Sequence, residues 1–132
     1  MVDALRRACG FLAPSGCVVD VHPTAALARL EVGELIIGPI DAGDAPLRHE
    51  AATAAVSAAV AEGFVRVEQV SEFDFFTYGD SAEELAEYIE ENWREAHIGR
   101  VAVDRAREAV RAAPGTKPRV LERVRITVLR PT

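Results

Sequence analysis

Cysteine is scarce in this chain, which has only Cys9 and Cys17 among 132 residues. Two cysteines at this spacing provide neither a disulfide framework nor a zinc site, so we expect free thiols in a reducing cytoplasm. No apolar run approaches the ~18 residues that a membrane helix needs, and none near the N-terminus has signal-peptide length. The net charge of −6 disfavours contact with phosphate backbones. These shortages argue against secreted, membrane and nucleic-acid-binding classes.

The remaining composition is that of an ordinary globular protein. Hydrophobic residues make up 49% of the chain and charged residues 27%, which predicts one compact domain over residues 1–132. Helical spacing, period-two alternation and turn residues predict eight elements in sequence. They are a helix at 2–12, a buried strand at 17–22, a hairpin at 28–40, a helix at 46–62, a strand from 64, helices at 81–96 and 101–113, and a strand at 119–129.

Local signals set several of these boundaries. Gly33-Glu34 lies between two apolar runs and predicts a tight hairpin turn. Ser81 and Glu84 form a capping-box signature at a helix start. The strand that begins near residue 64 continues through "EFDFF", with a bulge or bend expected near Ser71. The order of elements predicts an α/β fold in which helices pack on a single mixed β-sheet.

Three stretches carry a resemblance to a known family. "LRRACGFLAPSGCVVDVHP", residues 5–23, resembles the helix, Leu-x-Pro-Gly-Gly turn and fifth strand of class I S-adenosylmethionine-dependent methyltransferases, with Ser15 in place of the first glycine. "AAVSAAVAEGFVRVEQVSEFDF", residues 54–75, resembles the following helix, Gly-Phe turn and strand. "RVLERVRITVLRPT", residues 119–132, resembles the closing antiparallel strand. The resemblance implies a methyltransferase-like half-fold with an inserted β-hairpin.

That family binds its cofactor in the N-terminal half of its fold, and no part of this chain resembles that half. No Gly-x-Gly turn follows a strand in this chain, so no cofactor is predicted within it and no cofactor-binding residue can be assigned. In the family the fifth strand is paired on both sides, so strand 17–22 is expected to have a free edge. Either the hairpin covers this edge, or a second copy pairs with it. We therefore predict a homodimer whose interface involves the first strand, the hairpin or segment 73–78.

Asp20 and His22 are the first candidate site residues. Two positions apart on a strand, they face the same way near its C-terminal end, where ligand crevices open in α/β sheets. They could also be metal ligands, with His49 as a third and Asp41 or Asp44 as others, although this spacing matches no known ligand pattern. In the simpler interpretation, Asp20 caps the turn after a core strand.

The other candidates lie in the second half of the chain. Phe76 and Tyr78 could stack a flat ligand or form a protein interface, but core packing of segment 73–78 is the more common arrangement. Arg123 and Arg125 share a strand face, and the acidic helix at 81–95 is expected to pair with them. His97 follows that helix, where the helix dipole favours a cation.

These observations favour a non-catalytic, methyltransferase-like domain that acts as a dimeric binding or interaction module. Its expected partners are a second copy of the chain and other proteins. One alternative is a methyltransferase completed by a partner chain or built around a rearranged cofactor site. Another is a small-ligand or metal-binding protein centred on Asp20 and His22. No Ser-His-Asp, Cys-His or paired-carboxylate arrangement can be assembled from the sequence, so no catalytic residue is assigned.

Overall fold

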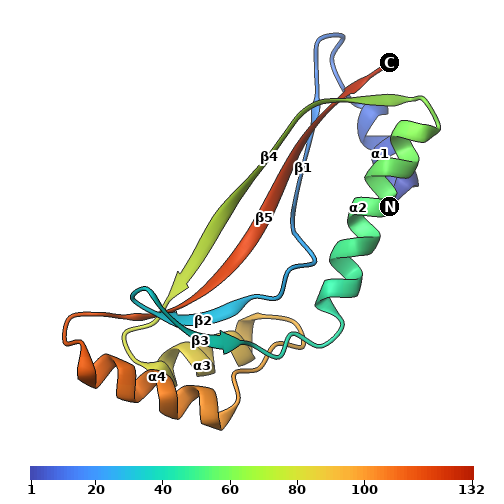
Figure 1. The fold of residues 1–132 in the computed structure, drawn as a ribbon. Helices are drawn as coiled ribbons and strands as arrows, with labels where there is room; N and C mark the ends of the chain where they lie inside the picture. The colour runs from blue at the N-terminus through green and yellow to red at the C-terminus, as the bar shows by residue number, and fades with distance from the viewer.

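The computed structural model describes residues 1–132 and contains four helices and five strands (Figure 1). All of the elements expected from the sequence are present. In chain order they are α1 (Val2–Gly10), β1 (Val18–Pro23), β2 (Arg29–Val32), β3 (Leu35–Pro39), α2 (Ala45–Ala61), β4 (Val65–Tyr78), α3 (Ala82–Asn92), α4 (Arg100–Ala112) and β5 (Pro118–Pro131). None of the helices combines the length and hydropathy that would let it cross a membrane.

The long strand β5 organises an open five-stranded sheet. β4 pairs with β5 along one edge, from Val65↔Pro131 to Tyr78↔Arg119. The other edge of β5 is shared, because β1 pairs with residues 124–129 and β2 with residues 118–121. β3 then pairs with β2. Every one of these pairings is antiparallel, so the expectation of a mixed sheet is wrong in this respect, although β1 and β4 run parallel on either side of β5.

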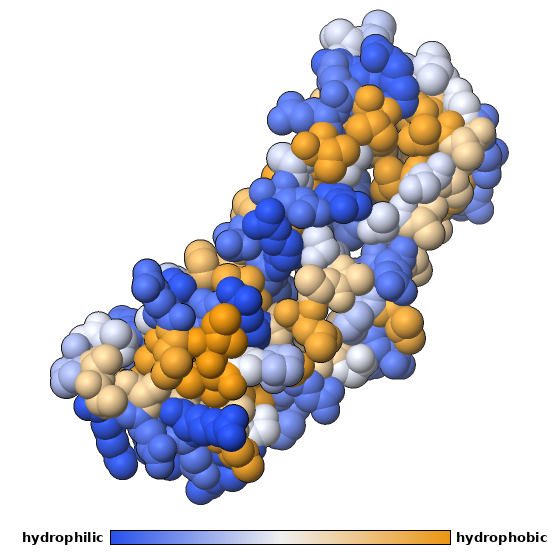
Figure 2. Space-filling model, viewed as in Figure 1, coloured by the Kyte–Doolittle hydropathy of each residue, from blue (hydrophilic) through white to orange (hydrophobic).

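Helices cover opposite faces of the sheet at its two ends. Near the end of β5, Leu129 packs with Leu5 of α1 and Val56 of α2. Near its start, Val120 packs with Leu30 of β2 and with α3 and α4. Because Val120 and Leu129 are nine positions apart, their side chains point to opposite faces. The molecule therefore has two hydrophobic cores, one at each end of a long ribbon, and Figure 2 shows hydrophilic and apolar side chains side by side in the middle between them.

Local chemistry explains the elements whose boundaries were predicted well. Ser81 Oγ accepts a hydrogen bond from the Glu84 N–H at 3.1 Å, which confirms the capping box. Gly33 has φ of 58°, the left-handed conformation that the turn between β2 and β3 requires. Two details differ from the sequence expectations. The bulge in β4 falls between Val67 and Gln69 rather than near Ser71, and α3 ends at Asn92, four residues before the predicted end.

Part of one sheet face has no helix over it. We call this the open face, and it lies on the side opposite α1 and α2, since the register places its side chains level with Val124, Ile126 and Val128 of β5. Val19 and Val21 are 54% and 55% exposed there, so the expectation that the first strand is buried on both faces is wrong. The residues of the open face are Val19, Val21, Phe73, Phe75, Ile126 and Val128.

Candidate functional site

Asp20 and His22 form a polar link between β1 and α2. As expected from their spacing, both point to one face of the strand, and His22 Nδ1 lies 2.7 Å from Asp20 Oδ2. The other ring nitrogen, Nε2, lies 3.0 Å from the Thr53 hydroxyl on α2. Thr53 was missed in the sequence because nothing in the helix pattern shows which residue faces β1. Through His22, whose side chain is largely buried, these contacts connect α2 to β1.

The order carboxylate, imidazole, hydroxyl is that of a nucleophile triad, but the hydroxyl hydrogen has another partner. Thr53 Oγ1 donates to the His49 carbonyl one helical turn earlier, at 3.2 Å. Thr53 Oγ1 thus lies within hydrogen-bond distance of both His22 Nε2 and the His49 carbonyl, and its single hydrogen can be donated to only one of them. Both nitrogens of His22 are also occupied, and no three His, Cys, Asp or Glu side chains are close enough together to hold a metal ion.

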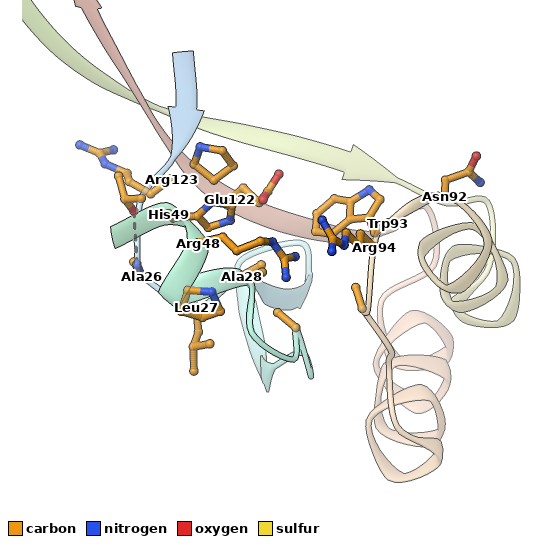
Figure 3. A pocket seen from close by; sticks show the side chains of 16 residues that line it. Ala26, Leu27, Ala28, Arg48, His49, Asn92, Trp93, Arg94, Glu122 and Arg123 are labelled. Carbon is orange, nitrogen blue, oxygen red and sulfur yellow. Dashed lines mark hydrogen bonds between the residues drawn. The ribbon is translucent and has the colours of Figure 1, made fainter. Parts of the chain in front are cut away.

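A cavity of about 300 Å³ opens directly beyond β1, where the strand leaves the sheet at Pro23. It lies between the first turn of α2, the turn after α3 and the short stretch of β5 that joins its two pairing regions (Figure 3). The small residues Ala28, Ala45 and Pro46 form much of its wall. The cavity opens at the end of the first strand, but Asp20 and His22, the residues expected to line a crevice there, do not line it.

The polar groups of this cavity come from three elements. Arg48 and His49 lie on α2, Arg94 follows α3, and Glu122 lies on β5; Figure 3 shows Arg48, Arg94 and Glu122 directed into one space. Burial raises the pKa of the Glu122 carboxyl, and no hydrogen-bond or ion-pair partner faces it. Burial, together with the charges of His22 and Arg48, lowers the pKa of His49 and favours its neutral ring.

Trp93 supplies the aromatic wall of the cavity. Helical spacing with Leu85 and Ile89 predicts Trp93, together with Tyr88, for the buried stripe of the helix at 81–96, but the chain leaves the helix at Trp93, whose backbone is extended. Its side chain is half-buried between the cavity and the hydrophobic core that contains Val120. Tyr88, predicted for the same stripe, is 49% exposed. No periodicity signal could have placed Trp93 at a cavity, because helix periodicity says nothing about residues beyond the helix end.

Phe76 and Tyr78 belong to neither the cavity nor the core. Their rings lie 6.1 Å apart on the sheet face that carries Arg119, whose guanidinium stacks on Phe76 at 4.2 Å. Segment 73–78 as a whole is more exposed than the expected core packing, with Phe73 at 39% and Phe75 at 50%. Stacking by Arg119 occupies the ring face that a flat ligand would need.

The arginines of β5 find their partners across the strand, not on the acidic helix. Arg123 pairs with Asp74 and Arg125 with Glu72, each at 2.9 Å, on the neighbouring strand β4. The hydrogen bond from Arg125 lowers the pKa of Glu72. The expected partnership with α3 is therefore wrong, because cross-strand neighbours are closer than any helix on that face. His97, expected at the end of the acidic helix, lies beyond the end of α3; its backbone exchanges hydrogen bonds with Asp41, and its ring Nδ1 lies 3.5 Å from Glu90 Oε1.

Removing the charge of Glu122 should stabilise the protein above neutral pH. Since burial raises its pKa, the folded protein holds this proton at pH values where the unfolded chain has lost it, and stability falls as pH rises through the folded pKa. We expect Glu122→Gln to raise the melting temperature at pH 8 by ~3 °C and to leave it unchanged below the ordinary glutamate pKa of about 4.3. Calorimetric melting at several pH values checks this, and a pH-independent difference would contradict it.

Comparisons with protein-family models, curated proteins and solved structures find no match for this chain.

Proposed function

We propose that this chain is a non-catalytic interaction domain of methyltransferase-like ancestry that works as a homodimer. The open face is the observation that carries the proposal. Hydrophobic side chains from β1, β4 and β5 meet there without a covering helix, and Val19, Val21 and Phe75 are each at least half exposed. Contiguous apolar surface of this kind on a sheet usually marks an interface.

Two other exposed surfaces of the sheet, the outer edge of β4 and the face that bears Arg119 and Arg123, carry charged residues. The outer edge of β4 carries a bulge and the charged residues Arg66, Glu68 and Glu72, devices that discourage strand addition. The face that bears Arg119 and Arg123 is covered by cross-strand ion pairs. The outer edge of β1 has neither bulge nor pairing strand, since the hairpin pairs with β5 and leaves it uncovered. Other apolar side chains are exposed away from the open face, including Leu35 and Ile36 on β3 and Val67 and Val70 on β4, but only on the open face do apolar side chains from β1, β4 and β5 meet.

A second copy is the occupant that fits the open face. Helices α3 and α4 lie on the same side of the sheet as the open face, but near the start of β5. They therefore project beyond the open face and form a step at its border. Two copies related by a two-fold axis can lay one open face on the other, with each step beside the far end of its partner. Sheets packed in this way bury the same residues in both copies.

The arrangement of strands supports the proposed ancestry. β5 runs antiparallel to β1 and to β4, as the closing strand of the half-fold is expected to do. The unpaired outer edge of β1 lies where the family's fifth strand has a neighbour. The half-buried, unpaired cysteines Cys9 and Cys17 agree with the proposed cytoplasmic location.

Light scattering over a concentration series tests the homodimer. The wild type should have the mass of two chains at micromolar concentration, and Val21→Lys should weaken dimerisation at least about tenfold. Leu47→Lys is the matched control, because Leu47 is 63% exposed on α2, on the side of the sheet opposite the open face. A monomeric wild type, or a Val21→Lys variant that dimerises as well as the control, would overturn the homodimer.

Calorimetry with S-adenosylmethionine separates this proposal from the alternative of a methyltransferase with a rearranged cofactor site. The isolated chain should give no heat of binding, since no glycine-rich turn follows a strand. Saturable heat would refute the non-catalytic assignment. If the wild type is monomeric, association with another chain that supplies the missing strands becomes the supported alternative.

A further inference from the structure

We propose that the cavity beyond β1 binds a small zwitterion of amino-acid size. Its cationic group would lie against Glu122, its anionic group against Arg94 and Arg48, and its apolar body against Trp93. This inference is argued from the cavity and does not need the proposed dimer, although Glu122 lies directly opposite Phe75 at the border of the open face.

The size and lining of the cavity fit a ligand of this class. A volume of about 300 Å³ lies at the lower end of the range for small-molecule sites. Its wall combines an aromatic ring, small apolar residues and a few polar groups that converge from different elements, as ligand pockets generally do. Leu27, by contrast, points away from the cavity in Figure 3 and leaves its interior to the polar groups and Trp93.

Glu122 is the group that most needs a ligand. It is half-buried on β5, and the guanidinium of the next residue, Arg123, turns to Asp74 on the other face. Neither Arg48 nor Arg94 reaches it, since both direct their guanidinium groups to Glu95, at 2.9 Å and 4.0 Å. A bound ammonium group would give the Glu122 carboxylate the partner that it lacks.

Two charges on the ligand fit this cavity better than one. Arg94 is 75% exposed and has only the long contact to Glu95, so it is available to an incoming carboxylate. A ligand with only an anionic group would place its charge near Glu122 as well as the arginines. A ligand with only a cationic group would face two guanidinium groups. A zwitterion places its ammonium group at Glu122 and its carboxylate at the arginines. The neutral ring of His49 repels neither group.

The chain carries a direct reporter of this site, because Trp93 is its single tryptophan. Tryptophan fluorescence should therefore change saturably on addition of L-phenylalanine or L-leucine. The amines phenethylamine and isoamylamine keep the side chain and lose the carboxylate, while hydrocinnamate and isocaproate lose the ammonium group. Each of these analogues should bind at least about tenfold more weakly than its parent, since each leaves one charge of the cavity unpaired.

Glu122→Gln should weaken L-phenylalanine binding at least about tenfold while binding of hydrocinnamate is unchanged or improved. The control is Glu108→Gln, an exposed glutamate on α4 outside the cavity. Thermal melting of both variants verifies that they fold. The proposal is overturned if neither amino acid binds, if an analogue binds as well as its parent, or if Glu122→Gln binds L-phenylalanine as tightly as Glu108→Gln does.

Discussion

Replacing Arg119 by methionine should lower the free energy of unfolding by about 2 kcal/mol, because a buried carboxylate would keep only one of its two cationic partners. The charge in question is Glu31 on β2, which is only 2% exposed. Its two carboxylate oxygens are held by Arg119 at 3.0 Å and by Arg29 at 2.6 Å. Methionine keeps most of the apolar stem of Arg119, so the expected loss is mainly electrostatic.

Arg123→Met provides the matched control for this experiment. Arg123 lies on the same strand and the same face, four residues further on, but its partners Glu72 and Asp74 are 31% and 43% exposed. Water solvates those carboxylates when the arginine is removed, so the expected loss is under about 1 kcal/mol. Urea unfolding of the two variants compares them directly. Equal losses would mean that Glu31 does not depend on Arg119.

Local sequence signals predicted the parts of this fold that local physics determines. The capping box at Ser81 and the turn at Gly33 each depend on a few adjacent residues, and both are present as expected. The shared orientation of Asp20 and His22 follows from strand geometry alone and is likewise confirmed. Such features need no knowledge of the rest of the chain.

The features that were missed depend on contacts between distant segments. "CVVDVH" is apolar enough for a strand buried on both faces, but whether a helix covers each face is decided by α1, α2, α3 and α4 together. The cavity has the same origin, since Glu122 and Trp93 come from separate elements. Alternation along β5 predicts the sheet face on which Glu122 lies. The sequence does not indicate that its carboxylate is left without a hydrogen-bond or ion-pair partner.

The covered and uncovered parts of the sheet follow from the length of β5. A strand of 14 residues is longer than either helical layer can cover, so each layer protects one face at one end. Two areas of the sheet are left without a helix over them, one on each face, and they differ in their side chains. Cross-strand ion pairs of Arg119 and Arg123 cover one of them, whereas the open face has no such cover. This contrast is the physical reason for placing the interface on the open face.

The second large effect is expected from Gly79→Ala, at the junction between β4 and α3. A Cβ atom added at Gly79 would lie 2.6 Å from Leu85 Cβ and 3.0 Å from Leu85 Cα, closer than atoms of two side chains can approach. Leu85 cannot move aside easily, because it is 1% exposed in the core under α3 and its helix is held by the Ser81 cap.

The Gly79 N–H also donates to the Pro118 carbonyl at 3.1 Å, so a shift of this residue would strain the start of β5 as well. We therefore expect Gly79→Ala to lower the free energy of unfolding by about 3 kcal/mol, at the upper end for overpacking. Gly10→Ala is the control, since a Cβ there meets nothing within 4 Å and alanine suits a helix better than glycine. Urea unfolding should show the control at or slightly above wild-type stability. If Gly79→Ala unfolds at the same urea concentration as Gly10→Ala, the junction between β4 and α3 is looser than its close packing implies.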